Sequence, residues 1–198
     1  MGDVTDFSNF MGAVIDDRSF QRLGEVLARS AAVSNISVLA GGKCDGEEGW
    51  FVQPTVLLGD DPTDEAFTRE YFGPILAVHV FEDDRYRDVV ACAAKTSPYA
   101  LTGAVVAQDR AAIADASELL RYAAGNFYIN DKPTGAVVGQ QPFGGSRASG
   151  TNDKAGSLQN LLRWTSSRAI KETFVPATNY LYPHMKHANA DGPAQQRE

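Results

Sequence analysis

The chain has 198 residues and a formal net charge of −7, enough length for one domain with a sizeable core or for part of a larger one. Its Lys and Arg residues are dispersed, which argues against the basic surface of a nucleic-acid-binding protein. No apolar run approaches the roughly 20 residues that span a bilayer, so we expect a soluble chain without membrane contact.

The first expected element is an amphipathic helix over residues 16–32, because its start is acidic and its apolar residues recur at helical spacing. The recurring residues are Phe20, Leu23, Leu27 and Ala31. A strand is expected over residues 36–39 and a second over residues 50–58. Pro54 within the second indicates an edge strand or a bulge.

Strands and helices then alternate up to Asn130. We expect a short helix in the segment that ends at Gly73 and Pro74. The nearly continuous apolar run of residues 75–81 predicts a strand buried on both faces. The further expected elements are a helix over 83–94, a strand over 102–107, a helix over 109–123 and a strand over 126–129. This alternation predicts an α/β fold with a mainly parallel sheet.

After Asn130 the organisation changes. Residues 131–153 are rich in glycine and are expected to form a long loop, which in a compact domain is often functional. Residues 158–173 are expected to form a short helix and a strand. The tail from Pro183 is polar.

The run Glu70-Tyr71-Phe72-Gly73-Pro74 is the first candidate site. A carboxylate at the end of a short helix can accept hydrogen bonds from a ribose diol, and an aromatic side chain two residues later can pack against a flat ring. The alternative is a simple helix stop, with Glu70 solvated or paired to Arg69.

The glycine-rich loop is the second candidate. It matches neither the Walker phosphate loop nor the dinucleotide fingerprint. Consecutive amides at Gly135 and Ala136 could form a nest that holds a carboxylate, and Phe143 offers an apolar wall. The alternative is a loop that only buries Phe143 and turns a corner.

The cysteines and histidines give weaker signals. Cys44 and Cys92 are too few for a disulfide framework and suit a reducing compartment. Lys43 could lower the pKa of Cys44, but no histidine is placed as a base. His79 is expected to be structural, and no metal site is expected. The acidic pairs 16–17, 60–61 and 83–84 are interpreted as helix caps.

Several long motifs carry a resemblance to a known family. Glu70–Pro74 resembles the E-x-F-G-P motif of the aldehyde dehydrogenase superfamily. The stretches AAGNFYIND, GQQPFGGSRASGTND and RWTSSRAIKET are similar to the pyrroline-5-carboxylate dehydrogenases of that superfamily. The resemblance extends from about Gly2 to about Tyr182 and implies a three-layer catalytic domain with a mainly parallel sheet.

The resemblance also implies a function and roles for residues. The family oxidises glutamate semialdehyde, an aldehyde that carries an α-carboxylate, to glutamate with NAD in proline breakdown. Glu70 would bind the nicotinamide ribose, and Phe72 would pack beside the nicotinamide. Gly135 and Ala136 would offer amides to the substrate carboxylate, and Phe143 would line its aliphatic part. Some members carry serine in place of Ala136, which keeps the amide but loses a hydroxyl contact.

The family's catalytic cysteine is expected upstream of this segment, so no catalytic residue is expected in residues 1–198, and the chain alone is expected to be inactive. Residues 1–182 would be the C-terminal part of the catalytic domain, with a final strand of the oligomerisation region near 162–173, followed by a polar tail over 183–198. A homo-oligomer in the cytoplasm is expected, with the mitochondrial matrix as the alternative compartment.

Two other functions stay open. The chain could be a non-catalytic fragment that acts as an assembly or interaction module for a longer partner. It could also belong to an acyl-phosphate reductase of proline synthesis, against which the E-x-F-G-P motif and the GQQPFGGSRASG loop argue.

Overall fold

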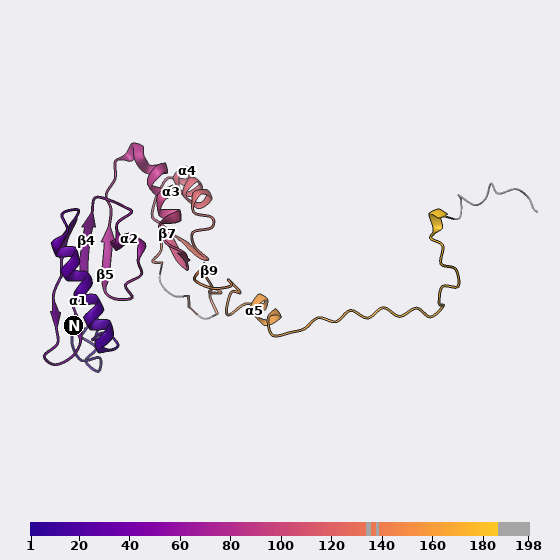
Figure 1. The fold of residues 1–198 in the computed structure, drawn as a ribbon, viewed down its shortest axis with the longest axis horizontal. Helices are drawn as coiled ribbons and strands as arrows, with labels where there is room; N and C mark the ends of the chain where they lie inside the picture. Colours follow the sequence, from indigo (N-terminus) through magenta and orange to yellow (C-terminus); the bar gives the residue numbers. More distant parts are fainter. Residues whose placement is uncertain (134–135, 138, 186–198) are drawn as a thin grey trace, which may run out of the picture. The chain divides into compact units, whose positions relative to one another are not determined.

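A computed structural model describes residues 1–133, 136–137 and 139–185. The chain divides into two compact units, Met1–Trp164 and Thr165–Glu198, and Figure 1 shows the elements of the first. The helices are α1 (Asp17–Ala32), α2 (Glu65–Thr68), α3 (Tyr86–Thr96), α4 (Arg110–Leu119) and α5 (Leu158–Leu162), with 3-10 turns η1 (Asp83–Arg85) and η2 (Pro183–Met185). The strands are β1 (Ile36–Ala40), β2 (Cys44–Asp45), β3 (Phe51–Val52), β4 (Thr55–Gly59), β5 (Ile75–Val78), β6 (Tyr99–Ala100), β7 (Thr102–Val105), β8 (Asn126–Ile129) and β9 (Ser146–Arg147).

Most expected elements are present, and the differences have local causes. Helix α1 begins where the acidic start predicts, with Asp16 accepting a hydrogen bond from the amide of Ser19 at 2.8 Å. Strand β8 has the predicted bounds. The strand expected over residues 50–58 is divided into β3 and β4 around Pro54, because proline has no amide to donate to a neighbouring strand.

The described residues form a mixed α/β structure. In the three-stranded sheet, β4 pairs with β1 in antiparallel and with β5 in parallel. Strands β7 and β8 form a second parallel pair, and the short pairs β2–β3 and β6–β9 are antiparallel. The α/β class is thus confirmed. The expected mainly parallel sheet is not present as one sheet, because the described chain contains only two separate parallel pairs, β4–β5 and β7–β8.

One expectation about strands is wrong for the described chain. Strand β5 is not buried on both faces, because Leu76 is 60% exposed and no described element covers that side. The strand expected near 162–173 stays a prediction, since residues 165–173 belong to none of the described strands. A strand requires a neighbour that satisfies its backbone groups.

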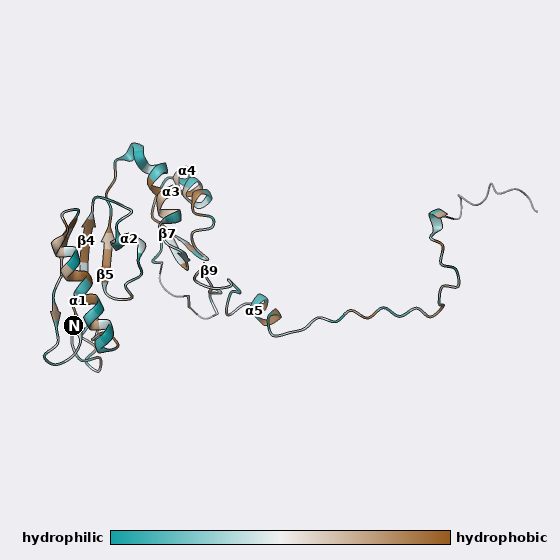
Figure 2. Cartoon of the chain, viewed as in Figure 1, coloured by the Kyte–Doolittle hydropathy of each residue, from teal (hydrophilic) through white to brown (hydrophobic). Residues whose placement is uncertain are grey.

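The core of the first unit lies between α1 and the strands. One cluster joins Leu23, Val26 and Leu27 of α1 to Val52 and Tyr71, and a second joins Ile36, Leu57 and Ala66. Figure 2 shows the apolar strands β4 and β5 and the alternation of apolar and polar residues around α1. The amphipathic spacing read from the sequence therefore corresponds to burial of one face of α1.

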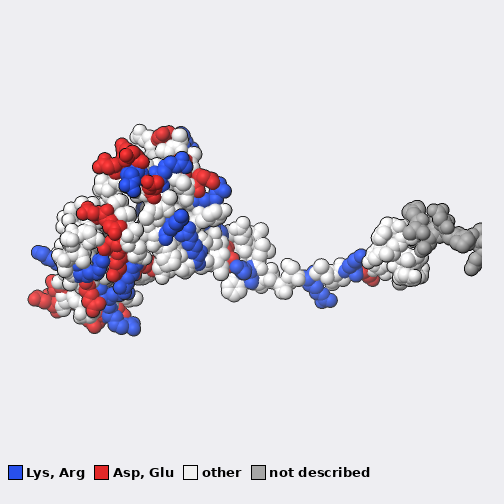
Figure 3. Space-filling view, turned by 45° about the horizontal axis from the view of Figure 1, so that its top comes forward, with Lys and Arg blue, Asp and Glu red and all other residues white. Residues whose placement is uncertain are grey.

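Charges are intermixed on the surface of the first unit. On the face drawn in Figure 3, acidic and basic side chains lie among one another, without a large uniformly basic area. None of the helices in the described ranges is long and apolar enough to cross a membrane.

One ion pair ties the end of α1 to the start of α2. Asp64 caps α2 by accepting from the amide of Ala66 at 2.8 Å. It also accepts three hydrogen bonds from Arg29, which reach both of its oxygens, and one from Asn35 at 3.0 Å. The Arg29 guanidinium, more than the other donors, lowers the pKa of Asp64 to about 2. The cap of α2 is therefore Asp64, and the acidic pair at 60–61 was assigned this role wrongly.

We expect Asp64→Ala to reduce the free energy of unfolding at pH 7 by roughly 2–4 kcal/mol, because it removes a helix cap and leaves Arg29 unpaired. The folded pKa lies below the unfolded value near 3.8, so the contribution of Asp64 is present above about pH 4 and is lost as the pH falls through about 2. Urea unfolding of the parent and of Asp64→Ala at pH 7 and at about pH 2 measures the difference in the free energy of unfolding.

The matched control is Asp61→Ala. Asp61 is exposed, and its carboxylate accepts from the amide and hydroxyl of Thr63, two residues away, so its loss should change stability by less than about 0.5 kcal/mol. Equal losses for the two variants at pH 7 would contradict the role of the Arg29–Asp64 pair.

Candidate functional site

The Glu70–Pro74 segment leaves α2 and is held on the core by alternate residues. Tyr71 is buried in the cluster that contains Leu23. Gly73 lies against the same leucine, so closely that a Cβ at this position would stand 2.5 Å from its side chain. Pro74 accepts a hydrogen bond from the amide of Thr55 at 2.8 Å. The segment is therefore fixed at its middle and at its end.

This anchoring turns Glu70 and Phe72 outward. Phe72 is 80% exposed, with φ at 55°, a left-handed conformation that is unusual for a bulky residue. Glu70 is exposed and makes no hydrogen bond or ion pair with another described residue. The alternative pairing with Arg69 is absent, because Arg69 pairs with Glu65 at 3.3 Å. An acceptor and an aromatic face are thus both accessible to a ligand.

Sequence patterns predict no role for Tyr71. Burial is the main cause that raises the pKa of its phenol, and its hydroxyl oxygen is buried without a hydrogen-bond partner in the described structure. The side chain is an anchor that sets the directions of Glu70 and Phe72. The sequence around Tyr71 does not show that its side chain is the buried one, so this anchoring role could not be predicted.

The glycine-rich loop contains the other candidates. Residues 139–155, which overlap it, are called the substrate loop below, after the role that the family resemblance implies for Phe143. Gly135 lies outside the described residues, and Ala136 is half-buried. Phe143 is also half-buried, and its backbone forms a two-way bridge with Ala155, with N···O distances of 2.9 and 2.8 Å.

The substrate loop is attached to β8 and β6 at several points, although the sequence predicts no structure there. Gln141 donates to the hydroxyl of Tyr128 at 2.7 Å. Ser149 accepts from the amide of Ala100, the residue with which Ser146 pairs in β6–β9. None of the hydrogen bonds among the described residues joins this loop to the Glu70–Pro74 segment, so the two candidate regions are built separately.

Lys154 and Asn126 hold the substrate loop and were not recognised in the sequence. The ammonium of Lys154 donates to Gly125, Asn126 and Gly144, and burial lowers the pKa of this lysine. Asn126 lies inside one family-like stretch and Lys154 directly follows another, but neither residue type signals a structural clamp.

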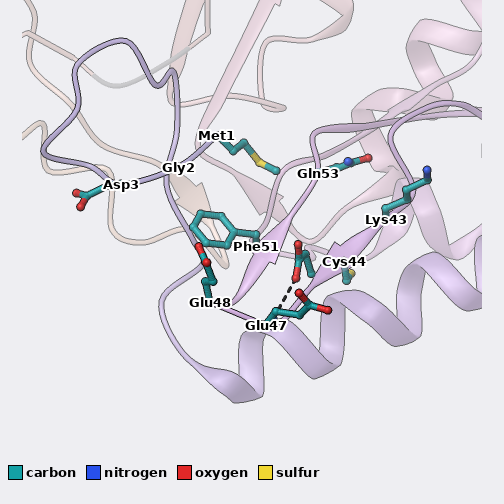
Figure 4. Close-up of a pocket in the computed structure, with 10 residues that line it drawn as sticks. Met1, Gly2, Asp3, Lys43, Cys44, Glu47, Glu48, Phe51 and Gln53 are labelled. Atoms are coloured by element: carbon teal, nitrogen blue, oxygen red, sulfur yellow. Dashed lines mark hydrogen bonds between the residues drawn. The ribbon is translucent and has the colours of Figure 1, made fainter.

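The two cysteines lie on separate elements, Cys44 on β2 and Cys92 on α3. Cys44 lines a 460 Å³ cavity together with the first three residues, Glu47, Glu48 and Phe51 (Figure 4). Burial raises the pKa of the Cys44 thiol, which opposes the lowering that Lys43 could have caused. Cys92 is half-buried in α3, where its closest polar side-chain partner is the Thr96 hydroxyl at 3.8 Å.

The histidines are structural where they are described. His79 contacts the carbonyl of Gly59 at 2.9 Å through Nδ1 and packs edge-on against Phe67. His184 stacks on Tyr182 in the second unit, and His187 lies outside the described residues. In the described ranges, no group of three His, Cys, Asp or Glu residues could hold a metal ion.

Comparisons with known proteins identify the relatives of this chain. It is 54% identical over 185 residues to the mitochondrial delta-1-pyrroline-5-carboxylate dehydrogenase of Dictyostelium discoideum, covering 93% of this chain and 33% of that protein. The human enzyme is 48% identical, with 94% of this chain and 33% of the relative covered. The chain thus spans about a third of the length of the curated relatives it matches.

Solved structures agree with these relatives. The delta-pyrroline-5-carboxylate dehydrogenase of Mycobacterium tuberculosis is 60% identical, with a TM-score of 0.80 over 93% of this chain and 34% of that one. A second structure of that enzyme contains bound NAD and matches with a TM-score of 0.78. This chain is therefore a close homologue of pyrroline-5-carboxylate dehydrogenases. Residues 1–170 match the aldehyde dehydrogenase family, and the chain belongs to that family.

Proposed function

We propose that this chain is the C-terminal part of the catalytic domain of an NAD-dependent pyrroline-5-carboxylate dehydrogenase, which oxidises glutamate semialdehyde to glutamate. The observation that carries the proposal is the outward pair Glu70 and Phe72 on a segment fixed to the core. Strain at Phe72 is the kind that persists at ligand sites, and a solved relative that matches 93% of this chain contains bound NAD.

Glu70 and Phe72 are suited to holding NAD. The Glu70 carboxylate would accept hydrogen bonds from the ribose hydroxyls of the nicotinamide nucleotide, and the exposed ring of Phe72 would pack beside the nicotinamide. NAD supplies the acceptor for the hydride that leaves the aldehyde carbon. The protein's part at these two residues is to bind and orient the cofactor.

The substrate loop and the residues before it would hold the substrate. The amides of Gly135 and Ala136 would donate to the α-carboxylate, and alanine at 136 keeps the main-chain donor. Phe143 would line the aliphatic chain. Its half-buried ring and fully bonded backbone suit a residue that must meet the substrate in one position.

The domain assignment follows from surfaces that the chain leaves uncovered. Residues 1–182 would form part of a three-layer domain whose remaining strands and helices cover the exposed side of β5. Near 162–173, Trp164 is 83% exposed and Ile170 is also exposed, as expected for a strand that pairs only in a homo-oligomer. Residues 183–198 would be a polar tail. The enzyme would act in the cytoplasm or the mitochondrial matrix.

The nucleophile would come from outside this chain. Covalent catalysis needs an activated thiolate, whereas burial raises the pKa of the Cys44 thiol and so disfavours its thiolate. Cys92 lies on α3, with its thiol 3.8 Å from the hydroxyl of Thr96. We therefore expect no turnover of glutamate semialdehyde by the isolated chain.

A chimaera tests the proposal. Residues 1–182 would replace the matching segment of the Mycobacterium tuberculosis enzyme, and NADH formation from pyrroline-5-carboxylate would be recorded at 340 nm for the chimaera and for the isolated chain. We expect turnover only by the chimaera, with Cys44→Ser and Cys92→Ser retaining activity. Glu70→Gln should raise the KM for NAD about tenfold, since it weakens a charge-assisted hydrogen bond.

Two results would overturn the proposal. One is a folded chimaera that binds NAD but does not oxidise pyrroline-5-carboxylate. The other is turnover by the isolated chain that is lost in Cys44→Ser or Cys92→Ser. Inactivity of the chimaera together with tight binding of the isolated chain to a full-length relative would instead support an interaction module.

A further inference from the structure

The side chain of Lys154 has an unusual set of partners. Its Nζ donates to the carbonyl oxygen of Gly125, to Oδ1 of Asn126 at 3.2 Å and to the carbonyl oxygen of Gly144 at 3.1 Å. An ammonium group has three N–H donors, so all of them are used. In the part of the chain that the structure describes, none of its partners is a carboxylate, and the group serves to bring three neutral oxygen atoms together.

Asn126 extends the same arrangement to both sides of Phe143. Its Oδ1 accepts from the amide of Gly144 at 3.1 Å, and its Nδ2 donates to the carbonyl of Pro142 at 3.0 Å. The amide and carbonyl of Phe143 are bonded to Ala155. The two peptide groups that flank Phe143 are therefore each held twice, once by Asn126 at the start of β8 and once by Ala155.

The backbone shows that this arrangement is imposed by tertiary contacts. Lys154 has φ at 56°. This left-handed backbone conformation costs a residue with a Cβ about 1–2 kcal/mol. Such a conformation persists when the surroundings determine it. The substrate loop also lies directly on the strand, because a Cβ at Gly125 would stand 2.0 Å from the carbonyl oxygen of Gly144.

We propose that Lys154 and Asn126 form a clamp that positions Phe143 against the aliphatic part of the substrate. Lys154 is a positioning residue, because it acts on the substrate through the backbone on either side of Phe143. The identity of the substrate rests on the function proposed above, whereas the clamp rests on the geometry alone. Phe143 would touch a part of the substrate that does not react, so a loosened clamp raises KM and leaves kcat nearly unchanged.

The clamp is tested first in the full 198-residue chain by amide hydrogen exchange. We expect Lys154→Met to increase exchange at Phe143, Gly144 and Ala155 at least about tenfold, because these amides then open locally. Exchange in α1 should not change. Lys95→Met is the matched control, since Lys95 is exposed on α3 and should leave the three amides protected.

Two further variants separate the ammonium from the backbone at position 154. Lys154→Gly relieves the left-handed strain but still removes the donors, so exchange should remain fast. Lys154→Cys, made together with Cys44→Ser and Cys92→Ser and then aminoethylated, restores an ammonium at nearly the same reach. Protection of Phe143 and Ala155 should return in that protein.

The positioning role is tested in the chimaera. Lys154→Met should raise the KM for pyrroline-5-carboxylate about tenfold, with kcat within about twofold of the parent. Phe143→Ala should raise the same KM, and the double variant should be little worse than Phe143→Ala alone, because both changes remove one contact. The KM for NAD should be unaffected by either change.

The outcomes separate the clamp from the proposed function. Unchanged exchange in Lys154→Met overturns the clamp. Faster exchange without a change in KM overturns the positioning of Phe143 and leaves the clamp as a purely structural device. A parent chimaera that binds NAD but is inactive overturns the proposed function, and with it the positioning role, while the exchange result still decides the clamp.

Discussion

Leu23→Ala is expected to lower the free energy of unfolding of the chain by about 3–5 kcal/mol. Leu23 is 0% exposed and lies at the centre of the cluster between α1, β3 and Tyr71. Its replacement removes buried methyl groups and leaves a cavity that rigid neighbours cannot fill. Because Leu23 also packs directly against Gly73, the Glu70–Pro74 segment should lose its support.

Urea unfolding followed by circular dichroism measures this loss. Leu39→Ala is the matched control, because Leu39 lies on β1 and is exposed, so the same substitution should change stability by less than about 0.5 kcal/mol. A loss of under about 1 kcal/mol for Leu23→Ala would contradict the assignment of this residue to the core.

Gly125→Ala is expected to destabilise the chain by about 1–3 kcal/mol, since the new Cβ cannot fit. It would lie 2.0 Å from the carbonyl oxygen of Gly144 and 2.8 Å from the Cα of Gly145. Both are backbone atoms, so relief requires the whole substrate loop to move away from β8. The bonds of Lys154 to Gly125 and Gly144 would then be lost together.

The control variant for Gly125→Ala is expected to change the stability of the chain in the opposite direction. Gly24→Ala makes the same substitution in α1, where a Cβ would meet nothing within 4 Å. Alanine is a better helix former than glycine, so Gly24→Ala should stabilise the chain by about 0.5–1 kcal/mol. Both variants can be compared in one set of urea titrations. A neutral Gly125→Ala would show that the loop does not rest on the strand.

The parts of the fold that depend on near neighbours were predictable from the sequence. The spacing of Leu23 and Leu27 gave α1, and Asp16 marked its start. Pro54 indicated an edge strand or a bulge, whereas the expected strand is divided there into β3 and β4, and β4 is the central strand of its sheet. The burial of β5 was predicted wrongly, because the side chains that would cover Leu76 do not come from the described chain.

The candidate site was predictable only by residue type. Glu70 and Phe72 could be selected as an acceptor and an aromatic ring, but their outward direction depends on the burial of Tyr71 and the close fit of Gly73, which are tertiary contacts. Lys154 could not be selected, because a lysine in a polar stretch usually faces water. Its role depends on Asn126, which lies 28 residues earlier in the chain.

The hydrogen bonds of the substrate loop also determine where the chain first loses order. Glycine gives up more conformational entropy on folding than any other residue, and fixing each backbone position costs roughly 1–2 kcal/mol. Gly144, Gly145 and Gly150 therefore make an ordered loop costly, and the bonds of Lys154 and Asn126 offset part of that cost. Without them the loop should melt as an independent local unit, at a free energy well below that of global unfolding, while α1 and the β1–β4–β5 sheet remain folded.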